Sequence, residues 1–175
     1  LSGALGDLAN NYYYMGLVAQ ADSLFRQLIG MSRELYGPRH PHVADDLMNL
    51  AIVQSQLGHY DEADRDFREA LDITRAWYGS ASPQTADAAV QLARNLQFLK
   101  QPAEADSLLR GALEILEKAY GPDHRLVAGV LTDLGNEEIW QGRLAQAEGR
   151  YRRAVDIYRR TYGDHHQMVG VALAN

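Results

Sequence analysis

The chain has 175 residues, is 46% hydrophobic, contains no cysteine and carries a formal net charge of -6. The lack of cysteine excludes disulfides, thiolate metal sites and cysteine nucleophiles, and it fits a reducing compartment, so we expect a cytoplasmic protein. An acidic chain argues against a nucleic-acid partner, because phosphate binding draws on clustered Lys and Arg. No apolar run approaches the roughly 18 residues of a membrane span, and no signal peptide is visible, so no membrane insertion is predicted.

A Tyr-Gly dipeptide recurs every 42 residues without insertion or deletion. Its four copies are Tyr36-Gly37, Tyr78-Gly79, Tyr120-Gly121 and Tyr162-Gly163. A fixed period of this length is typical of stacked repeats, each of which buries its hydrophobic face against its neighbours. We therefore predict a single array over residues 1–175, with repeats at about 1–37, 38–79, 80–121 and 122–163. Residues 164–175 would begin a fifth repeat, and the sequence, which starts at Leu1, is expected to be a piece of a longer protein.

Each repeat contains two helical patterns. From His42 to Leu57 apolar residues recur every three or four positions, which predicts an amphipathic helix ended by a left-handed glycine at Gly58. A second helix is predicted from about Tyr60 to Trp77, ended by the glycine of Tyr-Gly in the same left-handed conformation. The two helices form an antiparallel hairpin.

The third repeat departs from this pattern, because Lys100 stands in the column of Gly58. A lysine held in the left-handed conformation should cost about 1 kcal/mol, so this turn is expected to be built differently.

The loops after Tyr-Gly contain the starts of the next helices. Ser82 before Pro83 predicts an N-cap followed by proline at the first helical position. His40, His124 and His166 occupy the column of Ser82, and because histidine is a weaker N-cap, hydrogen bonds across the loop are the alternative. A metal site built from His40, His42, His165 and His166 is not expected, because the histidines recur in separate loops without a second ligand pair. We expect neither metal nor cofactor.

The repeats share a helix-packing signature. In the second repeat it consists of Leu47, Leu50 and Ala51 in the first helix, then Ala63, Phe67 and Ala70 in the second. This pattern resembles the tetratricopeptide repeat, whose small residues let two helices approach closely. The common unit has about 34 residues, and the longer second helix and the loop Gly37 to Pro41 make this chain similar to kinesin light chain repeats. The resemblance implies an all-α, right-handed superhelical solenoid of antiparallel helix hairpins.

Charged residues also recur at the repeat period. Acid-first pairs four residues apart are predicted on every second helix: Asp22 and Arg26, Asp64 and Arg68, Asp106 and Arg110, Glu148 and Arg152. Such pairs contribute about 0.3–0.5 kcal/mol each, and an arginine ladder for an acidic partner is the alternative interpretation. A basic cluster of Arg150, Arg152, Arg153, Arg159 and Arg160 is interpreted as a charged outer helix face, with anion binding as the alternative.

The resemblance implies that a peptide segment or partner protein binds in a concave groove lined by the first helices. The residues expected to line it are Asn10, Tyr13, Tyr14, Asp45, Met48, Asn49, Ile52, Gln56, Val90, Gln91, Arg94, Gln97, Phe98, Thr132, Asp133, Asn136, Ile139 and Trp140. Tyr14, Phe98 and Trp140 share one column, which favours recognition of an apolar or aromatic side chain. Packing of these rings against the next first helix is the alternative. With Arg94 as the one cation of this set, no clamp for a peptide carboxylate is expected.

An enzyme is the hypothesis from another class. Adjacent acids such as Glu137-Glu138 point about 100° apart on a helix, and no phosphate loop, Gly-x-Ser-x-Gly or His-Glu-x-x-His motif is present. We predict a non-catalytic interaction scaffold. The alternatives are a self-assembling module, a homo-oligomer joined through exposed array ends, and a regulatory module of a larger protein that carries a kinase or an ATPase.

Overall fold

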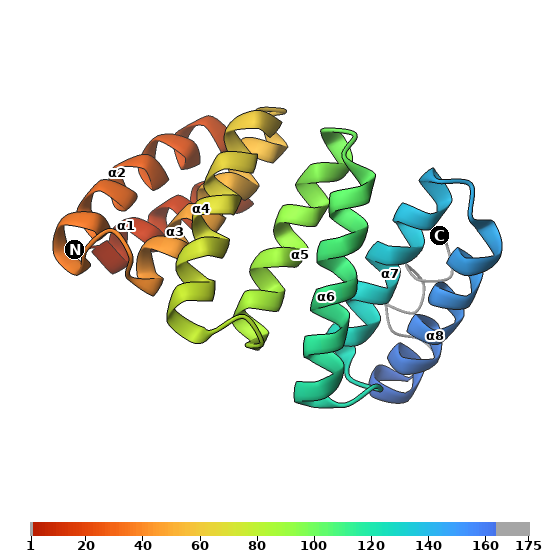
Figure 1. Ribbon diagram of the computed structural model, residues 1–175. Helices are drawn as coiled ribbons and strands as arrows, with labels where there is room; N and C mark the ends of the chain where they lie inside the picture. The colour runs from red at the N-terminus through yellow and green to blue at the C-terminus, as the bar shows by residue number, and fades with distance from the viewer. Residues whose placement is uncertain (1, 164–175) are drawn as a thin grey trace. The chain divides into compact units, whose positions relative to one another are not determined.

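The computed structural model describes residues 2–163, which form helices α1 to α8 without a strand among them (Figure 1). The first helices of the repeats are α1 (Ser2–Tyr14), α3 (Pro41–Gln56), α5 (Pro83–Phe98) and α7 (Arg125–Trp140). The second helices are α2 (Val18–Tyr36), α4 (Tyr60–Tyr78), α6 (Pro102–Tyr120) and α8 (Leu144–Tyr162). The all-α prediction is confirmed. The predicted fifth repeat, with His165 and His166, lies outside the described residues.

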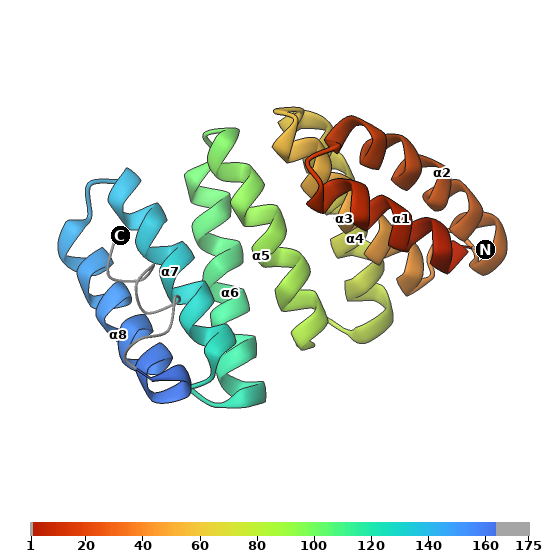
Figure 2. The ribbon, with the colours of Figure 1, turned by 180° about the vertical axis from the view of Figure 1, so that it is seen from behind.

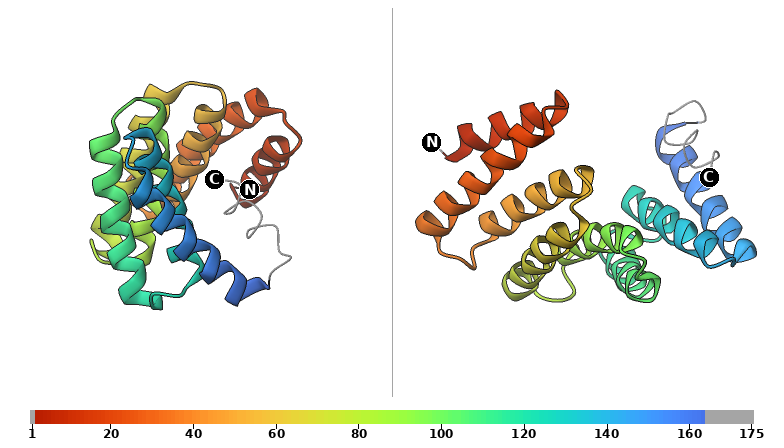
Figure 3. Two further views of the ribbon diagram at one scale, coloured as in Figure 1. Left: turned by 90° about the vertical axis from the view of Figure 1, so that its right-hand side faces the viewer. Right: turned by 90° about the horizontal axis from the view of Figure 1, so that it is seen from above.

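The chain divides into two compact units, Leu1–Ser80 and Ala81–Asn175. The first unit contains the hairpins α1–α2 and α3–α4, with α2 packed on α3. The second contains α5–α6 and α7–α8, with α6 packed on α7 and α5 also contacting α7 (Figure 2). The view from above shows the two helices of each hairpin running alongside one another (Figure 3). That the four repeats form one array stays a prediction.

Helix lengths account for the long repeat. Each of α2, α4, α6 and α8 has 19 residues, whereas α3, α5 and α7 have 16 each. Small residues stand where the helices of a hairpin meet: Ala51, Ala63 and Ala70 have no exposed surface. The large signature residues fill the space around them, with Leu47 and Phe67 only 2% and 3% exposed. Burial of such a side chain contributes about 1.5–3 kcal/mol.

The turn inside the third repeat is built like the others, so the expectation of a different turn is wrong. Lys100 has a φ of 56°, close to the 81° of Gly58. The Lys100 N–H donates to the Gln97 carbonyl at 3.1 Å, as the Gly58 N–H donates to the Ser55 carbonyl at 3.1 Å. The hydrogen bonds of this cap therefore hold a lysine in a conformation that glycine adopts more readily.

The glycine of Tyr-Gly ends each second helix, but in a different conformation from the predicted left-handed helical one. Gly37 and Gly79 have φ values of 89° and 87° and ψ values of 154° and 157°. Positive φ is as predicted, whereas ψ lies in an extended region that essentially only glycine populates. The chain therefore leaves the helix extended, which carries it to the start of the next hairpin.

Candidate functional site

The first helices of unit 1 carry predicted groove residues of graded exposure. On α1, Asn10 and Tyr13 are half-buried and Tyr14 is 82% exposed. The rings of Tyr13 and Tyr14 meet edge to face with centroids 5.6 Å apart. On α3, Asp45 and Gln56 are exposed, and Met48, Asn49 and Ile52 are half-buried. All eight side chains therefore keep some access to solvent.

The ten predicted residues of unit 2 divide into accessible and buried ones. Two are buried: Val90 on α5 is 6% exposed and Asp133 on α7 is 8% exposed. The accessible ones are Gln91, Arg94, Gln97 and Phe98 on α5 and Thr132, Asn136, Ile139 and Trp140 on α7. Among them Phe98 is 59% and Trp140 is 82% exposed.

One column of the repeat places an aromatic ring at the carboxyl end of a first helix. Tyr14, Phe98 and Trp140 are the last residues of α1, α5 and α7, and Gln56 is the last of α3. Exposure above four-fifths for Tyr14 and Trp140 means that most of each ring faces solvent, so neither ring is buried against a first helix of its own unit. Large exposed apolar side chains that recur at one structural position are typical of a contact surface.

Arg94 and Asp133 join the two first helices of unit 2. The Arg94 Nη2 lies 2.9 Å and its Nε 3.1 Å from Asp133 Oδ2. Burial raises the pKa of Asp133, and the charge and hydrogen bonds of Arg94 oppose that rise. The sequence presented Arg94 as an isolated cation, whereas the structure gives its charge a partner. The absence of a carboxylate clamp stays a prediction.

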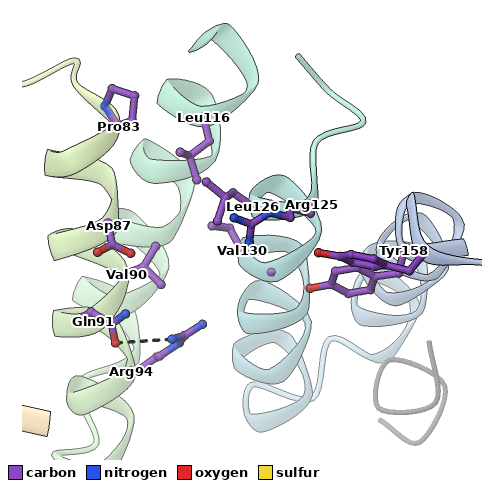
Figure 4. Close-up of a pocket in the computed structure, with 12 residues that line it drawn as sticks. Pro83, Asp87, Val90, Gln91, Arg94, Leu116, Arg125, Leu126, Val130 and Tyr158 are labelled. Carbon is purple, nitrogen blue, oxygen red and sulfur yellow. Dashed lines mark hydrogen bonds between the residues drawn. The ribbon is translucent and has the colours of Figure 1, made fainter. Parts of the chain in front are cut away.

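A cavity of about 310 Å³ opens between α5 and α7 in unit 2 (Figure 4). Its wall is mostly apolar, with Val90, Leu116, Leu126 and Val130, and the Tyr158 ring of α8 points its hydroxyl toward α7 (Figure 4). Polar side chains stand around this wall: Asp87, Gln91, Arg94 and Arg125. The cavity has the size and composition to accept one apolar side chain with polar neighbours.

Gly129 keeps this cavity open. A Cβ at Gly129 would meet only the Tyr158 hydroxyl, at 3.7 Å. A larger side chain at this position would therefore project toward the cavity. Unit 1 has a hollow at the corresponding place between α1, α2 and α3, of about 300 Å³, whose lining includes Gly3, Gly6, Asp45 and Asp46.

Two adjacent glutamates of α7 are buried, which sequence reasoning missed. Glu137 is 1% exposed and Glu138 is fully buried. Glu138 Oε1 lies 3.4 Å from Arg150 Nε and 3.7 Å from Arg110 Nη2. Burial raises the pKa of Glu137. Glu138, with its two arginine partners, joins helices, and neither buried glutamate belongs to an open acid–base pair.

The predicted acid-first pairs of the second helices are confirmed. Arg26, Arg68, Arg110 and Arg152 lie 2.8, 2.8, 2.6 and 2.6 Å from their carboxylates. The sequence did not predict that the same helices are also joined to one another, as Arg26 is to Glu62 at 2.9 Å and Arg33 to Glu69 at 2.7 Å. These arginines therefore already have anionic partners.

Four of the five arginines in the basic cluster of α8 are compensated in the same way. Arg150 is paired with Glu138, Arg152 with Glu148, Arg153 with Glu117 and Arg160 with Asp123. This favours the charged outer face over an anion site. Within residues 2–163 no group of three or more His, Asp or Glu could hold a metal ion. None of the helices in this part of the chain is long and apolar enough to cross a membrane.

Helix hairpins that recur at a fixed period, joined by glycine turns and closed by small residues at the helix crossings, define an all-α helical repeat protein. A tetratricopeptide repeat model matches residues 1–76 and 84–138, and a second one matches residues 127–167. The chain belongs to the tetratricopeptide repeat family. The recognition from the sequence is thereby confirmed.

Solved structures share this fold. The nearly identical repeats assigned to a kinesin light chain of Podosopora anserina match with a TM-score of 0.81 at 22% identity, over 97% of this chain and 80% of that one. BtubC (BKLC) from P. vanneervenii matches with a TM-score of 0.81 at 21% identity, over 97% and 70%. The apo form of RapI matches with a TM-score of 0.80 at 18% identity, over 99% and 67%.

At these identities the likeness is one of fold, and the fold is of the kinesin-light-chain-like type. No curated protein matches the chain in a sequence comparison.

Proposed function

We propose that the chain is a non-catalytic interaction module that binds a peptide segment or a partner protein along its first helices. The observation that carries this proposal is the exposed aromatic column. Tyr14, Phe98 and Trp140 hold the same repeat position and are 82%, 59% and 82% exposed. Aromatic side chains anchor interfaces because they bury a large area while losing little side-chain entropy.

The cavity of unit 2 supplies the second element of the proposal. An apolar side chain of the partner enters between α5 and α7, where Val90 and Val130 line the wall. Gln91 lies next to Val90, and its amide oxygen, which accepts a hydrogen bond from Arg94 Nη1 at 3.5 Å, has a second lone pair for a donor on the backbone of the bound segment. Such a mixture of an apolar wall and a few polar groups is typical of sites that hold a peptide side chain.

The partner is proposed to be a protein in the cytoplasm and not a nucleic acid. The chain is acidic, and four of the five arginines in the basic cluster of α8 have carboxylate partners. Catalysis is not proposed, because the adjacent acids Glu137 and Glu138 are buried. Self-assembly through the ends of the array is the alternative. Light scattering that finds a monomer at all concentrations would remove it.

A peptide selected from a random library against the 175-residue chain tests the proposal. Its affinity is measured by fluorescence anisotropy for the wild type and for Phe98→Ala, Trp140→Ala and Trp77→Ala. Trp77 is the matched control, because it is a second exposed tryptophan, 57% exposed, but belongs to a second helix. We expect losses of about 10-fold or more for Phe98→Ala and Trp140→Ala, and none for Trp77→Ala.

The opposite pattern contradicts the proposal. If Trp77→Ala weakens binding and the two first-helix variants do not, the contact surface belongs to the second helices. A further variant, Gly129→Leu, tests the cavity alone. Its side chain occupies the space beside Tyr158, so we expect it to weaken binding without removing either aromatic anchor.

A further inference from the structure

Helices α3 and α7 begin with a histidine that caps the helix through its ring. His40 Nδ1 accepts a hydrogen bond from the His42 N–H at 3.2 Å, and His124 Nδ1 accepts one from the Leu126 N–H at 3.3 Å. The backbone is the same at both caps, with φ of -80° and -79° and ψ of 145°. A ring nitrogen accepts a hydrogen bond only when it has no proton, so Nε2 carries the proton of each neutral ring.

A tyrosine fixes the orientation of each capping ring. His40 stacks on Tyr36 with centroids 5.0 Å apart, and His124 stacks on Tyr120 with centroids 4.6 Å apart. Each tyrosine belongs to the Tyr-Gly that ends the preceding second helix, α2 or α6. Within each unit, therefore, one histidine connects the end of a second helix to the start of the next first helix.

We propose that His40 and His124 make these two junctions sensitive to protons. Protonation places a hydrogen on Nδ1, which abolishes the acceptor and with it the cap. It also puts a positive charge at the amino end of a helix, where the dipole disfavours cations. Stacking of the charged ring on tyrosine favours the protonated form, but by less free energy than the lost cap costs. Loss of the cap on protonation therefore loosens the junctions, and imidazole side chains as a class change charge between about pH 5 and 8.

Few charged groups surround the two rings. Around His40 the neighbours are Tyr36 of α2, Trp77 of α4 and His42 of α3, whose own Nδ1 lies 4.0 Å from Asp45. The His124 ring contacts Tyr120 of α6, and its charged neighbours in the sequence are Asp123 and the first helical residue Arg125.

Asp123 is compensated, because its carboxylate lies 3.3 Å from Arg160 Nη1 of α8. On the same helix Arg153 donates to the Pro122 carbonyl of this loop at 3.0 Å. Within residues 2–163 neither capping ring forms an ion pair with a carboxylate, so none holds the proton there once it binds.

The chain contains two internal controls. Helix α5 begins with Ser82, whose hydroxyl accepts from the Thr85 N–H at 3.1 Å and does not titrate in this range. His59 stands at the N-cap position of α4, but its ψ is 56° and its ring makes no cap hydrogen bond. Among the helix starts of residues 2–163, a histidine ring cap is present at the α2–α3 and α6–α7 junctions, and proton sensitivity of this kind is proposed for these two.

NMR of the uniformly ¹⁵N-labelled 175-residue chain tests the geometry directly. At pH 8 the ring nitrogens of His40 and His124 are expected to report the Nε2-protonated tautomer. On titration to pH 5.5 the amide protons of His42 and Leu126 should move with the same midpoint as their capping ring. The Thr85 amide should not move, and neither should the first amides of α4, because the His59 ring makes no cap hydrogen bond to them. An Nδ1-protonated tautomer at either cap overturns the proposal for that junction.

The double variant His40→Ser, His124→Ser tests the consequence for stability. It copies the serine cap of α5. From pH 8 to pH 5.5 the thermal midpoint of the wild type should fall further than that of the variant, by about 2–4 °C for each cap. Buried carboxylates such as Asp46 and Asp133 titrate in both proteins and cancel in the comparison. Equal pH dependence in the two proteins contradicts the proposal, and the NMR titration of the wild type decides it independently of whether the variant folds.

Discussion

Arg94 of α5 donates two hydrogen bonds to the buried carboxylate of Asp133 on α7, from Nη2 at 2.9 Å and from Nε at 3.1 Å, both to Oδ2. The arginine is about half exposed, whereas the carboxylate is almost completely covered. The pair therefore joins two first helices at the edge of the cavity, and its two partners are not equivalent: removing the arginine leaves a buried charge, whereas removing the carboxylate leaves a solvated one.

Arg94→Ala is expected to lower the free energy of unfolding by about 2 kcal/mol at pH 7.5, because Asp133 stays buried without its counter-ion. Urea unfolding followed by circular dichroism measures this change. Arg152→Ala is the matched control, since Arg152 and Glu148 form an exposed pair, and we expect less than about 0.5 kcal/mol there. Similar losses in both variants would contradict the burial argument.

The effect of Arg94→Ala should also depend on pH. Burial raises the pKa of Asp133 above its ordinary value, so the charged form is disfavoured in the folded protein. A carboxyl with a raised folded-state pKa contributes stability at low pH that is lost as pH rises through that pKa. Without Arg94 the pKa of Asp133 rises further, because the charge and hydrogen bonds that oppose the effect of burial are gone. The deficit of Arg94→Ala should therefore shrink between pH 7.5 and pH 4.5, and a constant deficit would show that Asp133 does not titrate as described.

Two glycines of α7 should respond in opposite directions to alanine. At Gly135 a Cβ would lie 2.8 Å from two ring carbons of Tyr151, and this ring is held by the hydrogen bond of its hydroxyl to Asn136 at 2.7 Å. Gly135→Ala should destabilise unit 2 by about 1–3 kcal/mol. Gly129→Ala meets nothing closer than 3.7 Å and should stabilise it by about 0.5–1 kcal/mol, because alanine favours a helix interior. Thermal unfolding measures the stability of both variants. A Gly135→Ala variant as stable as Gly129→Ala, or more stable, would contradict the close contact between position 135 and the Tyr151 ring.

Lys100 occupies a position where glycine is more favourable. Its φ of 56° is matched by glycines in the other three repeats, Gly16, Gly58 and Gly142. Lys100→Gly is expected to raise the free energy of unfolding by up to about 1 kcal/mol, and Gly58→Ala to lower it by a similar amount. A destabilised Lys100→Gly variant would show that the lysine side chain contributes more than its backbone strain costs.

Amidation of the C-terminus of a selected peptide should leave its affinity unchanged. Recognition of a terminal carboxylate needs uncompensated cations, and Arg94, the cation expected on this surface, is bonded to Asp133. The measurement is an anisotropy titration with the amidated and the free-acid forms of the same peptide. Loss of binding on amidation would reveal a cationic site that the proposal omits.

The repeat period and the helix-packing signature sufficed to predict the hairpins, because both depend on local chain geometry. Leu47 and Phe67 are buried as predicted, and the acid-first pairs form because both partners are on one helix. Conformations at the loops were harder to predict. The extended ψ of Gly37 and the ring cap of His40 depend on how two helices approach each other, which residue types alone do not specify.

Burial on the first helices was the least predictable feature. Asp133 is buried, whereas Gln91 and Asn49 in the same column are half-buried, because Arg94 gives Asp133 a partner. Glu138 stands in the column of the buried Gln54 and has charged partners instead, the arginines Arg110 of α6 and Arg150 of α8. A helical pattern predicts which face is apolar, but whether a polar residue enters the core depends on partners from other helices.

The fluorescence of Trp140 tests the central claim most directly. The chain has two tryptophans, so Trp77→Phe leaves Trp140 as the single reporter at the end of α7. In the free protein its emission should be that of a solvated indole, in accord with 82% exposure. Saturation with the selected peptide should shift the emission to shorter wavelength and protect it from acrylamide quenching. Binding at full affinity with an unchanged spectrum and unchanged quenching would contradict the account, because the partner would then bind without covering the aromatic column.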